Sequence, residues 1–274
     1  FQNLEGGQMA SKLRPPPAMR REDYDLQADV FEQRQTPSIL GDGLIDLIPD
    51  SVILRHQDPD DVNEDGIRGV ARILTINGLP EVGKFGWKAQ VPRLGDFIRD
   101  AMGGECGITT PDDGRGFAML SDDDNVPDPE LSQNDLRSMG YFLSLLGPPP
   151  RGGSTDPRVA TGEALFSSLR CDRCHIPVLN GTEGPVALYS NLLLHVVQKA
   201  GFGGMSDPGA ETGMYRTPPL WGIKDTAPYW HDGRAETLRA AIEIHSGEAR
   251  ASTIAFHNLS REDKAALILF LEDL

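Results

Sequence analysis

The sequence is poor in basic residues and in cysteine, and it contains no long apolar run. Its 26 Lys and Arg face 41 Asp and Glu, a net charge of −15 that argues against nucleic-acid binding and favours a basic docking partner. No stretch approaches eighteen consecutive apolar residues, so we expect no membrane span. The chain begins at Phe1 without Met or a signal h-region, so we interpret it as processed or as a fragment.

Other chemistries lack their signatures as well. No P-loop, dinucleotide fingerprint or ordered Ser/His/Asp set occurs. Of the three cysteines, Cys106 stands alone far from the other two, so the second ligand cluster of a zinc finger is missing.

The most informative motif is Cys171-Asp172-Arg173-Cys174-His175. A C-x-x-C-H run is typical of c-type haem attachment: Cys171 and Cys174 form thioethers to the two vinyl groups, and His175 reaches the iron. The alternatives are half of a zinc site or a pair of buried cysteines. We expect one haem c and a periplasmic or otherwise extracytoplasmic location.

A Pro- and Gly-rich stretch from Gly147 to Gly153 divides the chain. We predict a linker over 148–155, a cytochrome c-like domain over 156–274, and the remnant of another over 1–147. Asp156 and Pro157 form an N-cap and first-turn pair, so we expect a helix that leads into the cysteine pair. The predicted fold class is mainly α: tandem cytochrome c-like helical domains with long loops, the first incomplete.

The two halves also resemble each other. The helical pattern that starts at Leu131-Ser132 recurs 128 positions later at Leu259-Ser260, and Thr36-Pro37 is matched by Thr217-Pro218. Chance similarity between Ser-capped apolar helices is the alternative. If the halves are repeats, the first lacks its haem motif, and we expect such a segment upstream: cleaved, carried by another subunit, or lost.

Several motifs together resemble the di-haem oxidoreductases, a family related to bacterial di-haem cytochrome c peroxidases. They are GDGLIDLIP (41–49), FGWKAQ (85–90), RTPPLWG (216–222) and TAPYWHDGR (226–234). The resemblance covers most of residues 35–274 and implies two cytochrome c-like domains with a haem in each, acting in peroxide reduction or electron transfer. The chain departs from the family pattern because it has no first C-x-x-C-H.

The sixth iron ligand needs a soft or imidazole donor. Candidates downstream of the motif are His195, Met205, Met214, His231, His245 and His257. In the related peroxidases, a stretch similar to 237–244 precedes a distal Met, and here His245 holds that place. We therefore predict bis-His ligation by His175 and His245, a closed iron that passes electrons, with His231 as the second choice.

Two residues near the Thr-Pro segment are candidates for haem contacts. Arg216 is expected to neutralise a propionate, and Trp221 to pack on the macrocycle, with core packing as the alternative for Trp221. The family relatives place a tryptophan between their haems, which points to Trp87.

An acidic loop contains the opening of a calcium site. Asp61, Asn63, Asp65 and the carbonyl of Ile67 occupy ligand positions, but the twelfth position is Arg72 instead of Glu, so a full EF-hand is excluded. Calcium and a solvated acidic turn both stay open.

Two functions follow from these residues. The first is a c-type cytochrome subunit that transfers electrons to or from a redox protein partner through one bis-His haem. The second is the C-terminal part of a di-haem peroxidase-like oxidoreductase whose peroxidatic haem lies upstream or in another chain. Whether this chain is itself an enzyme is left open.

Overall fold

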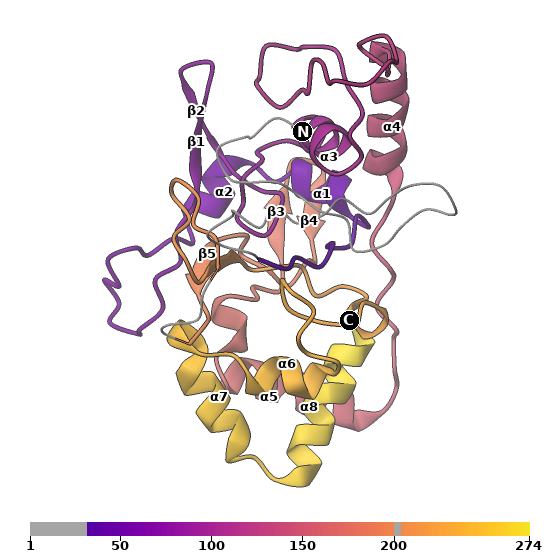
Figure 1. Ribbon diagram of the computed structural model, residues 1–274. Coiled ribbons are helices and arrows are strands. Elements are labelled where there is room, and N and C mark those ends of the chain that lie inside the picture. The colour runs from indigo at the N-terminus through magenta and orange to yellow at the C-terminus, as the bar shows by residue number, and fades with distance from the viewer. Residues whose placement is uncertain (1–31, 200–203) are drawn as a thin grey trace.

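The computed structural model describes residues 32–199 and 204–274 (Figure 1). The helices in this part of the chain are α1 (Asp42–Asp46), α2 (Asp50–Leu54), α3 (Leu94–Gly104), α4 (Gln133–Leu145), α5 (Pro157–Ser168), α6 (Leu238–Glu243), α7 (Arg250–His257) and α8 (Arg261–Asp273). Three antiparallel strand pairs accompany them: β1 (Ile73–Ile76) with β2 (Leu79–Val82), β3 (Leu179–Gly181) with β4 (Gly184–Val186), and β5 (Leu194–Val196) with β6 (Met214–Arg216).

The prediction of a mainly α fold is wrong. In the described residues only 34% of the chain is helical and 11% is strand, so irregular segments predominate. The physical reason lies in the 30 glycines and 21 prolines, which interrupt helices and supply the turns between short strands. None of the described helices has the length and apolarity needed to cross a membrane.

One hydrophobic core lies where α5 and α8 pack together, at the same end of the molecule as α6 and α7 (Figure 1). Gly162 of α5 allows a close approach, because a Cβ there would lie 2.1 Å from the carbonyl oxygen of Ala266. The rings of Phe166 and Phe270 pack beside this contact with centroids 5.4 Å apart. The predicted N-cap holds as well: the Asp156 side chain accepts from the N–H of Arg158 and starts α5.

A second core lies at the other end, among α1, α2, α3 and α4. Residues between Leu179 and Leu193 also belong to it, although they follow the haem motif in sequence, and Trp221 packs there too. The division predicted at 148–155 stays a prediction, but the second half of the sequence clearly contributes side chains to both cores.

The predicted repeat has a structural counterpart. Helices α4 and α8 each have 13 residues and a serine N-cap, Ser132 or Ser260, whose side chain accepts from the N–H of the aspartate three residues on. The last residues of the halves are also bound alike. Gly41 N–H donates to the carbonyl of Leu146 at 2.8 Å, and Gly222 N–H donates to that of Leu274 at 3.1 Å.

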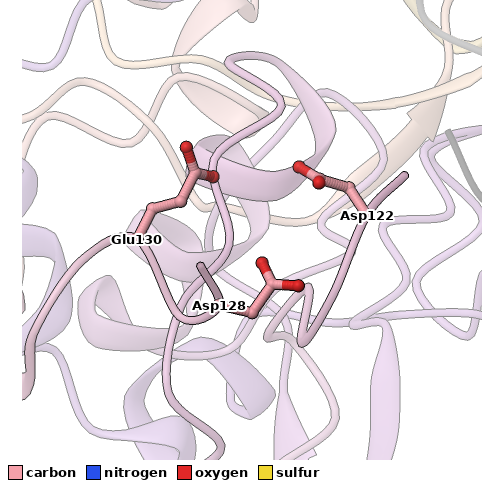
Figure 2. Close-up of side chains that lie close together, drawn as sticks. All are labelled: Asp122, Asp128 and Glu130. Atoms are coloured by element: carbon pink, nitrogen blue, oxygen red, sulfur yellow. The ribbon is translucent and has the colours of Figure 1, made fainter. Parts of the chain in front are cut away.

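The long loop between α3 and α4 brings three carboxylates together. Atoms of Asp122, Asp128 and Glu130 lie within 4.8 Å of one another (Figure 2). Glu130 also accepts the N–H of Thr109 at 2.8 Å, so this carboxylate fastens the loop to the end of α3.

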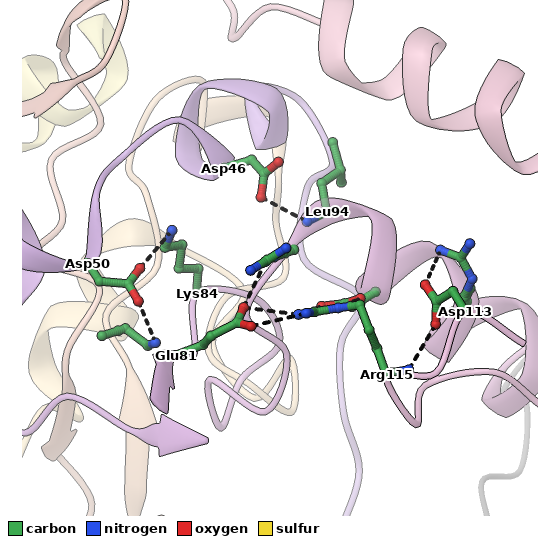
Figure 3. Close-up of polar contacts among 11 residues, drawn as sticks. Asp46, Asp50, Glu81, Lys84, Leu94, Asp113 and Arg115 are labelled. Atoms are coloured by element: carbon green, nitrogen blue, oxygen red, sulfur yellow. Dashed lines mark hydrogen bonds and ion pairs between the residues drawn. The ribbon is translucent and has the colours of Figure 1, made fainter. Parts of the chain in front are cut away.

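Ion pairs connect the elements of the first half (Figure 3). Arg115 Nη2 lies 2.9 Å from Glu81 and 2.7 Å from the buried Asp96, which joins β2 to α3. The Asp46 carboxylate accepts the N–H of Leu94 at 2.9 Å and so satisfies one of the free donors at the start of α3. The first half is therefore held together by charge as well as by its core.

Candidate haem site

A cavity of about 360 Å³ lies between the two cores. Both cysteines of the C-x-x-C-H motif, His175 and His245 line it, as do the Thr-Pro segments of both halves. The motif and the predicted sixth ligand, 70 residues apart in sequence (175 and 245), thus contact the same space.

Local structure presents the motif to the cavity. After α5 ends, Arg170 adopts a left-handed conformation with φ 65°, and a 3₁₀ turn follows over Cys171–Arg173. The backbone N–H of His175 donates to the carbonyl of Cys171 at 2.9 Å, which closes the motif into one compact turn. Both thiols are free, and burial, aided by Asp172, raises the pKa of Cys171 to about 12.

The two histidines have the same hydrogen-bond arrangement. His175 Nδ1 lies 3.0 Å from the carbonyl oxygen of Tyr189, and His245 Nδ1 lies 2.6 Å from that of Ala241. Each carbonyl accepts, so Nδ1 carries the proton and Nε2 is left as a free electron pair. Within the described chain neither Nε2 has a hydrogen-bond partner.

Electrostatics keeps both rings neutral. Burial, together with the neighbouring His245, lowers the pKa of His175 to about 3, and burial also lowers the pKa of His245. A neutral imidazole whose Nδ1–H donates to a backbone carbonyl is the usual form of a metal-ligating histidine. Both rings therefore have the form in which a histidine would hold a haem iron.

Arg216 supplies a buried cation with unused hydrogen-bonding capacity. Its Nε donates to the carbonyl of Gly86 at 2.9 Å, while its buried Nη1 has no partner among the described residues. Burial lowers the pKa of Arg216 to about 10, with Asp42 opposing the shift, so it stays protonated at neutral pH. A carboxylate such as a haem propionate fits this orphaned donor.

The other candidate residues differ in their surroundings. Trp221 lines the cavity but also packs on Gly41, where a Cβ would lie 2.3 Å from its ring. His231 reaches the cavity, stacks on Tyr215 at 3.8 Å and has its Nε2 engaged by Gln198 at 3.1 Å. Met205, Met214, His195 and His257 do not line it.

His195 and Glu248 form a buried pair that the sequence did not reveal. His195 Nδ1 lies 2.7 Å from Glu248 Oε2 and 3.6 Å from Cys174 Sγ. Burial opposes protonation of His195, but Cys174 and Glu248 together raise its pKa to about 9. A thioether at Cys174 carries no charge, so in the haem-bearing protein Glu248 is the remaining cause of that increase.

The predicted calcium ligands lie in a loop that contacts the motif. Asp61 Oδ1 accepts from the N–H of Asp65 at 2.9 Å and of Gly66 at 3.0 Å. Asp65 Oδ2 lies 2.7 Å from Arg170 Nη2, immediately before Cys171. Calcium binding here stays a prediction. The acidic group in Figure 2 is a separate cluster of carboxylates, and no further feature marks it as a ligand site.

Two thiols, two neutral imidazoles and an unpaired cation around one cavity are typical of c-type haem proteins. Residues 20–274 match the family described as "Di-haem oxidoreductase, putative peroxidase", and the chain belongs to this family. Membership confirms the resemblance seen in the motifs and implies haem c as the cofactor.

The individual proteins compared with this chain match it only over a short segment or at low sequence identity. Over 69 residues the chain is 38% identical to cytochrome-c peroxidase IdrP2 of Denitromonas iodatirespirans, a match that spans 25% of this chain and 18% of that protein. A MauG-like protein associated with microbial copper homeostasis is 14% identical with a TM-score of 0.46, covering 92% of this chain and 95% of its own. Kuenenia stuttgartiensis hydrazine synthase is 14% identical with a TM-score of 0.40, covering 95% and 100%.

Proposed function

We propose that this chain carries one covalently attached haem c and transfers electrons through it. The observation that supports this most is the pair of neutral imidazoles, His175 and His245, whose free Nε2 atoms belong to residues lining one cavity. When bound, the haem supplies a one-electron couple. The residues of this chain anchor and orient it.

Each residue has a defined task in this proposal. Cys171 and Cys174 would form the thioethers, His175 and His245 would hold the iron, and Arg216 would neutralise a propionate with its free Nη1. Two imidazole ligands would stabilise oxidised iron better than a His/Met pair does. The segment 156–274 would hold the covalent haem, with 148–155 as its linker.

The cellular setting belongs to the same proposal. Attachment of haem c implies a periplasmic or otherwise extracytoplasmic compartment. The net charge of −15 favours a redox partner with a basic docking face.

The test is to count haems per chain and to remove the sixth ligand. We expect one haem per chain by the pyridine haemochrome assay and a low-spin ferric spectrum. His245→Ala should convert the haem to high-spin while leaving it covalently bound, and His257→Ala, on an exposed residue of α7, should leave the spectrum unchanged. A low-spin His245→Ala variant would contradict the ligand assignment.

A second candidate function is the C-terminal part of a di-haem peroxidase-like oxidoreductase, and α4 favours it. Phe142 of α4 is 59% exposed, whereas Phe270, its counterpart in α8, is 0% exposed because α5 covers it. Tyr141 and Leu145 are exposed beside Phe142. This face of α4, which no described helix covers, thus matches the face of α8 that binds the helix leading into the haem motif.

We infer that a helix equivalent to α5, preceding another haem-binding segment, packs on this face. A photo-crosslinking residue at position 142 of the protein in its native host should capture a haem-bearing peptide, identified by mass. Arg137 is the matched control, because it and its counterpart Ala265 are both exposed. Crosslinks only to residues 1–31 or to a second copy would exclude this function.

A further inference from the structure

Glu248 is a largely buried carboxylate whose hydrogen bonds reach two separate segments, the loop at Arg68 and strand β5. Oε2 accepts from the backbone N–H of Arg68 at 2.8 Å and lies 2.7 Å from His195 Nδ1, and Oε1 accepts from the N–H of Val196 at 2.7 Å. The side chains of Glu248 and His195 are only 9% and 2% exposed. Burial alone would raise the pKa of Glu248, but these donors lower it, so it is an anion that holds both segments.

The other nitrogen of His195 connects to the haem motif. Asn191 Nδ2 lies 3.0 Å from His195 Nε2, and the N–H of Leu193 fixes the amide by donating to Asn191 Oδ1 at 3.0 Å. The backbone N–H of Asn191 donates to the carbonyl of Cys174 at 2.9 Å. The Asn191 amide N–H can only donate, so Nε2 accepts it and Nδ1–H donates to Glu248. This neutral ring belongs to the haem-bearing protein, where a thioether removes the part of the pKa increase that Cys174 causes.

This network joins the loops of the two proposed axial ligands. Glu248 lies three residues after His245, and Asn191 is bonded to the motif that contains His175. In the described part of the chain, no direct hydrogen bond connects residues 171–175 with residues 245–249. The hydrogen bonds of His245 itself are local: Nδ1–H donates to the carbonyl of Ala241, and Thr253 donates to the His245 carbonyl at 2.9 Å. Its ring also packs edge-on against Trp230, with centroids 5.1 Å apart.

The backbone supports the same connection. The N–H of Ser246 donates to the carbonyl of Val197 at 2.8 Å, next to strand β5. A Cβ at Gly247 would lie 2.1 Å from the carbonyl oxygen of Val196, so the turn that follows His245 is pressed against this strand. The turn that follows His245 is therefore held against β5, the strand that contains His195.

We propose that His195 and Glu248 are positioning residues that hold the His245 loop against the haem motif, so that His175 and His245 reach the same iron. The inference rests on the proposed bis-His haem. Neither residue touches the iron in this assignment. They act on the equilibrium between bound and released His245, because they fix the turn that follows it on β5 and so lower the cost of bringing its ring to the metal.

The test is the ligation state of the holoprotein. In Glu248→Ala we expect His245 coordination to weaken about 10- to 100-fold, as loss of an outer partner does at other metal sites. The readouts are the appearance of high-spin ferric haem and of carbon monoxide binding to the ferrous form. Covalent haem content should not change, because the thioethers and His175 remain. Glu243→Gln is the matched control: Glu243 lies two residues before His245, is exposed, and pairs only with Arg239.

If Glu248→Ala gives no holoprotein, variants of His195 provide the same test. His195→Gln retains an amide donor for Glu248, so it should release less His245 than His195→Ala does. The proposal is overturned if the Glu248 and His195 variants stay low-spin and inert to carbon monoxide while His245→Ala does not. If His245→Ala itself stays low-spin, the bis-His assignment has failed, and that result is distinct from the first.

Discussion

Some positions in this protein require glycine because another backbone segment lies in contact with them. Gly247 has φ 55° and stands against a backbone oxygen that cannot move aside. Gly78 has a similar positive φ of 78°, yet a Cβ there would meet nothing within 4 Å. Comparing substitutions at Gly247 and Gly78 therefore separates two free-energy costs: the strain of a positive φ, which both share, and the steric clash, which only Gly247 has.

Gly247→Ala should lower the free energy of unfolding by about 2 to 3 kcal/mol, because left-handed strain and a clash add. Gly78→Ala should lower it by only about 1 kcal/mol, from strain alone. Urea unfolding of the two variants measures the difference. Equal losses of unfolding free energy in the two variants would mean that the turn after His245 can shift away from Val196 at no cost.

The second residue-scale prediction concerns pH. Burial raises the pKa of Asp42 from 3.8 to about 6, with Arg216 opposing. A raised folded-state pKa stabilises the folded state below about pH 4, and this contribution is lost as the pH rises through 6. Relative to wild type, Asp42→Asn should therefore gain about 2 to 3 kcal/mol of stability between pH 4 and pH 7, measured by urea unfolding. A difference that does not vary with pH would contradict the shift.

At this scale the sequence predicted what covalent chemistry dictates. Cys171, Cys174 and His175 are recognisable because haem attachment requires that spacing, and the family comparison pointed to His245. Glu248 and Asn191 carry no such signature. Their importance comes from hydrogen bonds to residues up to 180 positions away, such as that between Arg68 and Glu248, and only the fold brings these together.

Among the elements, helices α4 and α5 each contain a glycine in a different packing environment. Gly162 of α5 faces the backbone of α8, and a Cβ would lie 2.1 Å from the oxygen of Ala266. Gly140 of α4 has only the Cδ1 of Ile98 near a Cβ position, at 3.7 Å, which is an ordinary contact.

The same substitution, glycine to alanine, is therefore expected to change stability in opposite directions at these two positions. Gly140→Ala should stabilise the protein by about 0.5 to 1 kcal/mol, because alanine restricts the unfolded chain and fits the helix. Gly162→Ala should destabilise it by about 2 kcal/mol or more, because α5 and α8 must separate. Thermal unfolding decides; stabilisation by Gly162→Ala would mean that the helices are not in close contact.

Helix signals in the sequence were reliable where a cap and an apolar face coincided, as at Ser132, Asp156 and Ser260. The predicted fold class was wrong because long irregular segments and short strands separate these capped helices. Strands of three or four residues, such as β3 and β5, carry too few alternating positions to be read from sequence alone.

The whole molecule combines a predicted internal repeat with a strongly acidic charge. The internal repeat in sequence predicted the matching helices, and the Gly41 and Gly222 hydrogen bonds extend that match to the chain segments beside the cavity. That residues 179–193 complete the other core was not predictable, since it depends on long-range packing.

Net charge leads to the prediction at this scale. Electron transfer to a basic mono-haem cytochrome should slow about tenfold between low and high salt, because screening removes the attraction of a chain with net charge −15. An acidic redox protein of similar potential serves as the control, and its rate should rise with salt. Stopped-flow measurement of both reactions provides the check, and rates independent of salt for both would exclude electrostatic docking.

The cavity has one practical consequence. All three tryptophans of the sequence, Trp87, Trp221 and Trp230, line it. Haem absorbs strongly where indole emits, so energy transfer would darken every indole in a molecule that contains the pigment. Ultraviolet-excited fluorescence of a purified sample would then come from molecules that never received their cofactor, and its intensity would report the completeness of maturation without any added label.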